Sequence, residues 1–380
     1  MRKVAVVGSF QTRFERAKRN LDYREMIYRS VQSGLDGNGI SIEQIDTLVG
    51  AGCDFQDGRS ISSVFTVEAM GGFLKEESKI EEDGIFAAVY AYQRIMSGMY
   101  DTAMVVAYSK GSELAPTYYT GTMFEPIYSR PVGLDGLTAA ALQARKYMAV
   151  SGATEEQAAK VAVKNRANGL KNPRAQAGMD VSVEDVLRSE VLASPVKKLD
   201  APPISDGCCV LFMAAEGTAE KMCSKPAWVL GAGYIMDHYY LGAMDLAGVP
   251  GCRKAAQMAY QAAGLKDPAA EIDVAEVYEA TSFHELILYE ALGFCPVNDG
   301  GKLIDSGETQ PGGKLPVNPS GGALCANAMI ATGLVRVAEA AMQVSGTAGA
   351  HQAPGVKTAL AHGFNGNALQ HNAVIVLGAR

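Results

Sequence analysis

A pair of closely spaced glycines near the C-terminus is the first feature with a clear chemical use. His362 precedes the run Gly363-Phe364-Asn365-Gly366. Glycines let the backbone approach a ligand, and free N–H groups in such a loop can hold an oxygen atom that gains negative charge during a reaction. The loop therefore predicts a ligand-binding site, and His362 is a candidate to face it.

Two ionisable residues, Tyr278 and Glu279, follow a short β-rich run at 274–277. Ligand sites of α/β proteins often lie just beyond the carboxyl ends of buried strands. A phenol at such a place can carry a proton, whereas Glu279 can instead be a structural acid that accepts backbone N–H groups. His284, one turn into the helix expected next, is more typical of a helix cap or a core histidine.

The seven cysteines carry no metal-binding signature. They form no C-x-x-C pair, and none has metal-ligand spacing to another cysteine or a histidine, so we expect no metal in this chain. An odd number of thiols fits a reducing compartment, and the N-terminal apolar run is too short for a secretion signal. We therefore expect a soluble cytoplasmic protein without a membrane span.

The composition and net charge exclude two classes of protein. The 380 residues include 34 Lys+Arg and 41 Asp+Glu, a formal net charge of −7, with 48% hydrophobic and 20% charged residues. This composition is typical of a globular protein with a large core and not of a disordered chain. The acidic balance argues against a nucleic-acid partner, which would require a basic face.

The elements that must position these residues occur twice along the chain. Each half reads as strand, helix, strand, amphipathic helix (given below by the stretch in which it ends), helix, strand and strand. In the first half they are expected at 3–8, 23–35, 45–53, 67–73, 84–97, 101–109 and 208–216. In the second half they are expected at 226–233, 252–265, 272–280, 288–294, 325–344, 357–364 and 372–380. This repeat predicts two copies of one α/β domain, at 1–225 and 226–380, related by a pseudo-twofold axis.

The first half also carries an insertion at about 111–206. Its segment 116–136 is punctuated by Gly and Pro and contains the aromatic residues Tyr118, Tyr119, Phe124 and Tyr128. A loop of this length is unusual in a compact domain and is often functional. A lid over the site and a packed surface loop are the two interpretations that remain open.

Three stretches of sequence resemble the thiolase superfamily, and especially its sterol-carrier-type and lipid-transfer-protein-like branch. They are NRANGLKNPRAQ at 165–176, SDG at 205–207 and NPSGG at 318–322. The resemblance implies a thiolase fold, in which two duplicated α/β halves form five layers, αβαβα. It also implies an enzyme that makes or breaks a carbon–carbon bond in a CoA thioester, first of all by thiolase-type acyl transfer on a β-ketoacyl-CoA.

The resemblance also assigns candidate site residues. In the family, a cysteine thiolate at a helix N-terminus attacks the thioester carbonyl. This chain has Gly84 at that position. Tyr278-Glu279-Ala280-Thr281 replaces the second-half motif, and Asn327 lies in the loop that carries Gly-His-Pro in other members. Gly322 and the loop at 363–366 are the implied contacts for coenzyme A.

The missing nucleophile at Gly84 leaves four explanations open. The chain has naturally changed to retro-aldol cleavage of a CoA-linked side chain, or Gly84 replaces the cysteine of a true thiolase. Alternatively, Cys325 acts from the equivalent helix of the second half, whose N-terminus is expected at 325–327. Free cysteine is more often a small buried residue. In the fourth case the chain is a non-catalytic acyl-CoA-binding subunit.

The resemblance further implies the ligand and partners. The ligand is coenzyme A or an acyl-CoA, whose phosphates require Lys or Arg near the entrance, with Arg130, Lys197 and Lys198 as candidates. The aromatic segment suits a bulky or aromatic acyl group. The implied partners are a second copy of the chain, contacting through the strand near 104–107, and a small zinc-ribbon and OB-fold subunit of the DUF35 type.

Overall fold

Buried strands rich in apolar residues form the frame of the protein. The computed structural model describes residues 2–379. The expected start of the first half at residue 1, and the expected end of the second half and its last strand at residue 380, therefore lie outside the described residues. Its main strands are β1 (Val4–Gln11), β2 (Thr47–Ala51), β3 (Glu76–Ile80), β4 (Thr102–Lys110), β7 (Asp206–Ala215), β8 (Ala227–Met236), β9 (Val274–Glu276), β10 (Thr358–Asn365) and β11 (His371–Gly378). Strands β7 and β11 are buried along their whole length, which explains their continuous apolar character.

The strand order repeats between the two halves. Hydrogen bonds join the strands in the order β3-β2-β4-β7-β1-β8-β11-β10-β9. In the first half β2 runs parallel to β3 and β4, and β4, β7 and β1 are antiparallel neighbours. In the second half β9 is parallel to β10, and β10, β11 and β8 are antiparallel neighbours. A parallel bridge between Ala275 and Val317 takes the position of β3.

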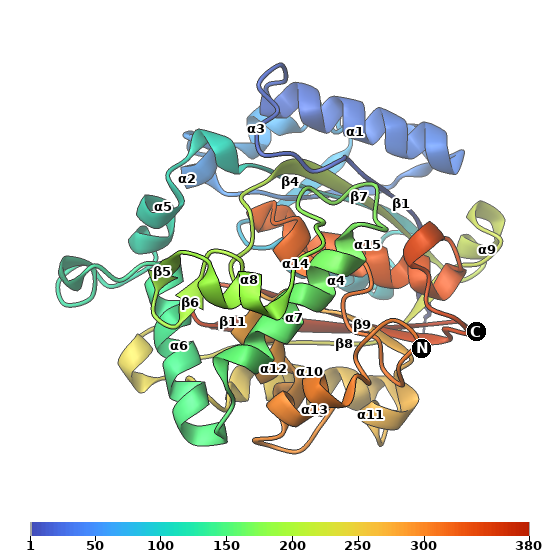
Figure 1. Cartoon of the computed structure of the whole chain (residues 1–380). Helices are drawn as coiled ribbons and strands as arrows, with labels where there is room; N and C mark the ends of the chain where they lie inside the picture. The colour runs from blue at the N-terminus through green and yellow to red at the C-terminus, as the bar shows by residue number, and fades with distance from the viewer. Residues whose placement is uncertain (1, 380) are drawn as a thin grey trace.

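Helices cover both half-sheets and separate them (Figure 1). Helix α1 (Tyr23–Asn38) packs on the outer face of the first half, and α10 (Pro250–Ala263) on that of the second. Helices α4 (Gly84–Met96) and α15 (Thr332–Ser345) pack against each other between the half-sheets, which remain joined at the edge through β1 and β8. The buried apolar residues accordingly form a central cluster and two outer ones. The expected five-layered αβαβα thiolase fold is confirmed.

The other helices connect the strands or belong to the insertion. They are α2 (Asp54–Asp57), α3 (Ser63–Thr66), α5 (Pro116–Thr122), α6 (Gly136–Ser151), α7 (Glu155–Gly169), α8 (Val183–Arg188), α9 (Ala219–Met222), α11 (Pro268–Glu271), α12 (Ser282–Ala291), α13 (Gly300–Ser306) and α14 (Gly322–Cys325). Strands β5 (Val191–Ala193) and β6 (Val196–Lys197) form a small hairpin. No helix within residues 2–379 has both the length and the apolarity needed to cross a membrane.

Two of the expected helices are wrong. The amphipathic helix expected to end in the stretch 67–73 is a single turn, α3, which ends at Thr66; Gly71 has φ of 79°, outside the helical region. The helix expected at 325–344 begins only at Thr332. Met329 has φ of 43°, and its N–H donates to the side chain of Asn327 instead of continuing a helix. The N-terminus equivalent to that of α4 is therefore at Thr332 and not at 325–327.

Two further expectations about the first half need correction. Segment 116–136 is irregular only in part: Pro116 begins helix α5, where its missing N–H costs nothing, and this helix ends at Thr122. The strand near 104–107 cannot form a subunit interface, because β4 lies between β2 and β7 and these four residues have no exposed surface. The free edge of the first half-sheet is β3.

Candidate functional site

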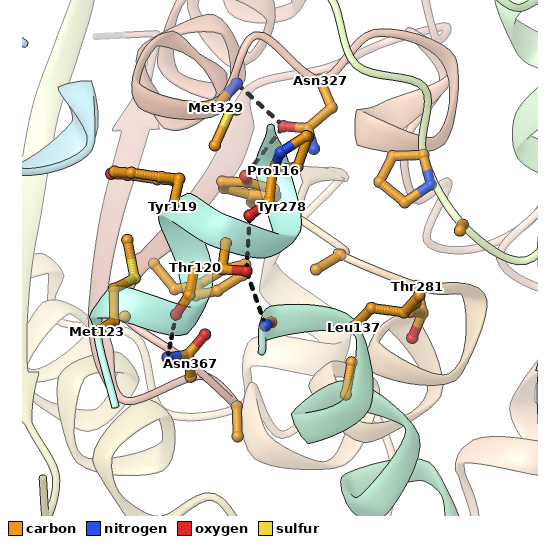
Figure 2. A pocket seen from close by; sticks show the side chains of 18 of the residues that line it. Pro116, Tyr119, Thr120, Met123, Leu137, Tyr278, Thr281, Asn327, Met329 and Asn367 are labelled. Atoms are coloured by element: carbon orange, nitrogen blue, oxygen red, sulfur yellow. Dashed lines mark hydrogen bonds between the residues drawn. The ribbon is translucent and has the colours of Figure 1, made fainter. Parts of the chain in front are cut away.

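A cavity of about 440 Å³ lies where the insertion meets the second half. Helix α5 and the start of α6 form one side, and the segment after β10 and the residues after β9 form the other (Figure 2). Its lining includes Asp83, Tyr119, Thr120, Met123, Leu137, Tyr278, Thr281, His284, Asn327, Phe364, Asn365, Gly366 and Asn367. The cavity thus brings together side chains from both halves of the chain.

Tyr278 and Asn327 form a hydrogen-bonded pair in this cavity. The Tyr278 hydroxyl donates to Asn327 Oδ1 at 3.0 Å (Figure 2). The same Oδ1 accepts from the Thr332 hydroxyl at 2.9 Å and from the Met329 N–H at 3.1 Å. These three donors fix the amide orientation and leave Asn327 Nδ2 available to a ligand oxygen. Burial raises the pKa of Tyr278, so the phenol stays protonated at neutral pH.

Asp83 is a cavity residue that sequence analysis missed as a candidate. Its Oδ1 accepts from the Ile85 N–H and its Oδ2 from the Gly333 N–H, both at 2.9 Å. One carboxyl group thus joins the N-termini of the equivalent helices α4 and α15, and a Cβ on Gly333 would overlap it. Burial raises the pKa of Asp83 to about 8, although the two N–H bonds oppose this shift. The available signal was an Asp directly before a predicted helix start.

Gly84, the first residue of α4, is buried and tightly packed. A Cβ at this position would lie 2.7 Å from Ala107 Cβ and 2.7 Å from Leu334 Cβ. Such distances are far below van der Waals contact, so a cysteine here would require β4 or α15 to move. The surroundings of Gly84 are therefore shaped for glycine.

Cys325 does not lie in the cavity. It ends α14 without exposed surface, and its thiol donates to the Asn165 carbonyl at 3.3 Å. Burial raises the pKa of this thiol to about 12, so it is not a thiolate at neutral pH. Among the cavity-lining residues of the described chain there is neither cysteine nor serine. The expected position of Cys325 at a shared helix N-terminus is therefore wrong.

Three other candidates also lie outside the cavity. Glu279 is fully buried and accepts from the Leu324 N–H at 3.0 Å and from Asn318 Nδ2 at 2.9 Å, so it supports the NPSGG loop. Gly322, with φ of 64°, lies so close to Glu279 that a Cβ would overlap its carboxylate. The His362 ring lies 3.2 Å from Asn372 Oδ1, and burial lowers its pKa to about 4. These three residues support the segments that line the cavity.

The glycine loop is divided between the cavity and the core. Phe364, Asn365 and Gly366 line the cavity, and the Phe364 ring centre is 4.5 Å from that of Tyr278. Gly363 packs against α4 instead, because a Cβ there would be 2.6 Å from Ile85 Cγ2. His284, expected as a cap or core residue, lines the cavity as well. Burial lowers its pKa to about 3, so its ring is neutral.

The insertion contributes fewer functional side chains than expected. Of its four aromatic candidates only Tyr119 lines the cavity, since Tyr118 and Tyr128 are 66% and 70% exposed and Phe124 packs in a small separate cluster. The Arg130 guanidinium donates to the Phe124 carbonyl at 2.7 Å and holds its own segment together. Buried Lys197 pairs with Glu155, and exposed Lys198 lies 3.8 Å from Glu190. None of the three expected phosphate-binding cations lines the cavity.

Known proteins resemble this chain over most or part of its length. Residues 233–379 match the family model described as Thiolase C-terminal domain-like. An acetyl-CoA acetyltransferase of Methanothermobacter thermautotrophicus is 29% identical, and the alignment covers 96% of this chain and 97% of that protein. Bovine sterol carrier protein 2 is 34% identical over 57% of this chain, which spans only 41% of that relative. A benzoylsuccinyl-CoA thiolase subunit of Thauera aromatica is 30% identical over 61% of this chain and 60% of its own length.

A solved structure has the same fold as this chain. The Ltp2–ChsH2(DUF35) aldolase superimposes with a TM-score of 0.87 at 23% identity, over 99% of this chain and 98% of that one. This likeness concerns the fold, in which the two halves are arranged about the cavity described above. The chain is therefore similar to proteins of the thiolase superfamily, among them the sterol-carrier-type proteins.

Proposed function

We propose that the chain is a CoA-thioester enzyme that breaks or forms a carbon–carbon bond next to the thioester carbonyl. One relative is named an acetyl-CoA acetyltransferase and another a thiolase subunit, which supports thiolase-type acyl transfer on a β-ketoacyl-CoA as the reaction. The observation that carries the proposal is the cavity at the N-termini of α4 and α15, with Tyr278 and Asn327 in its wall. The substrate is coenzyme A itself or an acyl-CoA.

The cavity has polar groups that can stabilise the enolate of this chemistry, although no thiol is among the described residues that line it. Cleavage or formation of the bond passes through an enolate, whose negative charge gathers on the thioester oxygen. The donor Asn327 Nδ2 and the positive ends of the two helix dipoles stabilise a charge at this position. Tyr278, protonated because it is buried, donates a proton to the α-carbon as the enolate collapses.

The packing of Gly84 favours retro-aldol cleavage as a second candidate. This reaction needs no acyl-enzyme, so it needs no thiol. A base removes the proton of the substrate β-hydroxyl, the Cα–Cβ bond breaks, and the electron pair forms the thioester enolate, which Tyr278 protonates. Asp83 is the carboxyl group that lines the cavity, and we assign its ionised form, which becomes the main form above pH 8, as the base. The products are a carbonyl compound and a shortened acyl-CoA.

Calorimetric titration with CoA and with acetyl-CoA tests the proposed function directly. We expect saturable binding of both ligands, and competition between them, because both would occupy the same cavity. A chain that binds neither ligand, while remaining folded by circular dichroism, would contradict the proposal.

Asp83 also predicts a pH dependence of stability. Its carboxyl has a pKa near 4 in the unfolded chain and about 8 in the fold, so the folded state holds the proton more tightly. This contribution to stability is present below pH 4 and is lost as pH rises to 8. We expect the Asp83→Asn variant to lose less unfolding free energy than the parent between pH 5 and 8.5. Parallel curves in chemical denaturation would contradict this assignment.

We propose that the protein is at least a homodimer joined at the free edge strand β3. Phe73 and Leu74, just before this strand, are 77% and 90% exposed, and apolar exposure beside an open strand edge is typical of an interface. We expect light scattering at micromolar concentration to give twice the chain mass, and Leu74→Glu to lower it. A monomeric parent chain would contradict the proposal.

The DUF35 component named in the structurally similar aldolase supports a second, small subunit of that type.

A further inference from the structure

One buried histidine in the wall of the cavity has no part in the proposed chemistry. His284 lies in the first turn of α12, lines the cavity and is only 1% exposed. Its Nδ1 has no hydrogen-bond partner among the described residues. Within residues 2–379, no other residue of the cavity lining has a fully buried side-chain nitrogen or oxygen without such a partner. A buried polar atom left unpaired costs free energy, which a ligand recovers by bonding to it.

The contact with Gln143 decides which nitrogen of the His284 ring carries the proton. His284 Nε2 lies 2.8 Å from Gln143 Oε1. The amide of Gln143 is oriented by its Nε2, which donates to the Ala368 carbonyl at 3.4 Å, so its oxygen faces the histidine. His284 Nε2 is therefore the protonated nitrogen, and burial keeps the ring neutral by lowering its pKa to about 3. Nδ1 remains as an acceptor, which bonds to an O–H or N–H group and not to a carbonyl or carboxylate oxygen.

Helix α6 places His284 beside an apolar part of the cavity wall. Leu137, Ala140 and Gln143 are spaced three residues apart, so they share one face of α6. The first two line the cavity, and the third holds the His284 ring. The hydrocarbon part of an acyl group fits against such a wall, whereas the amide groups of a pantetheine arm require polar partners.

His284 is a second polar point, separate from the pair formed by Tyr278 and Asn327. The ring of Phe364 lies next to both Tyr278 and His284, with its centre 4.5 Å from the first ring and 6.3 Å from the second. It meets the His284 ring edge-on, at an interplanar angle of 78°. A ligand group that reaches His284 therefore lies away from the thioester carbon that reacts at Tyr278.

We propose that His284 is a specificity-determining residue, which accepts a hydrogen bond from a hydroxyl group on the acyl chain of the substrate. The inference rests on the proposed function, since it takes a CoA thioester as the ligand of the cavity. The hydroxyl is additional to the one at the reacting carbon, which the retro-aldol reaction places beside Asp83. An acyl chain without the hydroxyl leaves Nδ1 unpaired, and a site built for a hydroxyl rejects such an analogue.

Binding measurements with matched thioesters test this assignment. The parent is titrated with hexanoyl-, heptanoyl- and octanoyl-CoA, and with the same three thioesters carrying a hydroxyl on the terminal carbon. We expect at least one hydroxylated thioester to bind about 10- to 100-fold more tightly than its plain counterpart, the range for pairing a buried acceptor. This first comparison needs no substitution, so it does not depend on the folding of a variant.

Two substitutions of His284 separate its acceptor from its shape. His284→Leu removes the acceptor and should bind both members of each pair equally, with the affinity of the parent for the plain thioester. His284→Asn supplies an amide oxygen near the position of Nδ1 and should retain part of the preference. His362→Leu is the matched control, because His362 is also a fully buried neutral histidine but does not line the cavity, and it should keep the full preference. Circular dichroism establishes that each variant is folded.

Each other outcome has a definite meaning. A parent that binds no hydroxylated thioester more tightly than its plain counterpart would overturn the inference while leaving the proposed function intact. A preference that survives in His284→Leu, or that disappears equally in His284→Asn or in His362→Leu, would overturn the role of the acceptor. An equal loss of affinity for plain thioesters and for free CoA in His284→Leu would overturn the assignment to the acyl chain, because His284 would then contact a part common to all these ligands. Failure of the parent to bind any of them would instead reject the proposed function.

Discussion

Replacing Tyr278 with phenylalanine is expected to lower the rate of carbon–carbon bond cleavage by about 10²- to 10⁴-fold, the usual contribution of a positioned acid or base. The substitution removes the hydroxyl that donates to Asn327 at 3.0 Å and leaves the ring that packs against Phe364. The cavity should therefore keep its shape and its affinity for the acyl-CoA. The loss is expected in kcat, because the phenol acts on the enolate and not on the bound substrate.

A second buried tyrosine provides the control for this variant. Tyr260 is 8% exposed, and its hydroxyl donates to the Leu292 carbonyl at 2.7 Å in the outer layer of the second half. Tyr260→Phe removes a comparable hydrogen bond far from the cavity and should leave kcat unchanged. If Tyr278→Phe retains the parent kcat, or loses only as much as Tyr260→Phe, the phenol is not the proton carrier.

Introducing cysteine at Gly84 is expected to strain the protein rather than create a thiolase. The new Cβ would meet Ala107 and Leu334 at 2.7 Å, and overpacking of this kind costs about 1–3 kcal/mol of stability. We therefore expect Gly84→Cys to unfold at lower denaturant concentration than the parent. We also expect no covalent acyl adduct after incubation with an acyl-CoA, because the thiol has no prepared position.

Intact-protein mass spectrometry measures the adduct, and a second variant makes the result decisive. Gly84→Cys/Leu334→Ala removes one of the two side chains that collide with the new Cβ, and Leu334→Ala alone is its control. An adduct on Gly84→Cys, in a variant as stable as the parent, would indicate that the site retains the geometry of a thiolase and that Gly84 replaces a natural cysteine. An adduct only in the double variant would show that packing at Leu334 is what excludes the thiol.

Most of the fold could be predicted because its strands are buried. Strands such as β7 and β11 expose neither face, so they appear in the sequence as uninterrupted apolar runs, and the same run order in both halves reveals the duplication. The start of α15 could not be predicted. It depends on the Asn327 side chain, which accepts the Met329 N–H and diverts the backbone, and such a local hydrogen bond leaves no periodic signal.

Only part of the candidate site could be predicted, because the sequence alone does not show which side chains point into the cavity. Tyr278 faces the cavity, whereas Glu279 points the other way to the NPSGG loop, since successive residues of an extended chain alternate in direction. Asp83 was overlooked because its importance comes from Gly333, which is distant in the sequence and meets it only in the fold.

Product analysis by mass spectrometry is the most direct test of the central claim, that this cavity breaks or forms a carbon–carbon bond in a CoA thioester. The chain, alone and with a DUF35-type subunit, is incubated with 3-hydroxyacyl-CoA and with 3-ketoacyl-CoA plus free CoA. We predict that a shortened acyl-CoA appears from at least one of these substrates and that Tyr278→Phe slows its formation by about 10²- to 10⁴-fold. Recovery of every thioester intact, under conditions where calorimetry shows it bound, would contradict the claim and identify the chain as an acyl-CoA-binding subunit without catalysis.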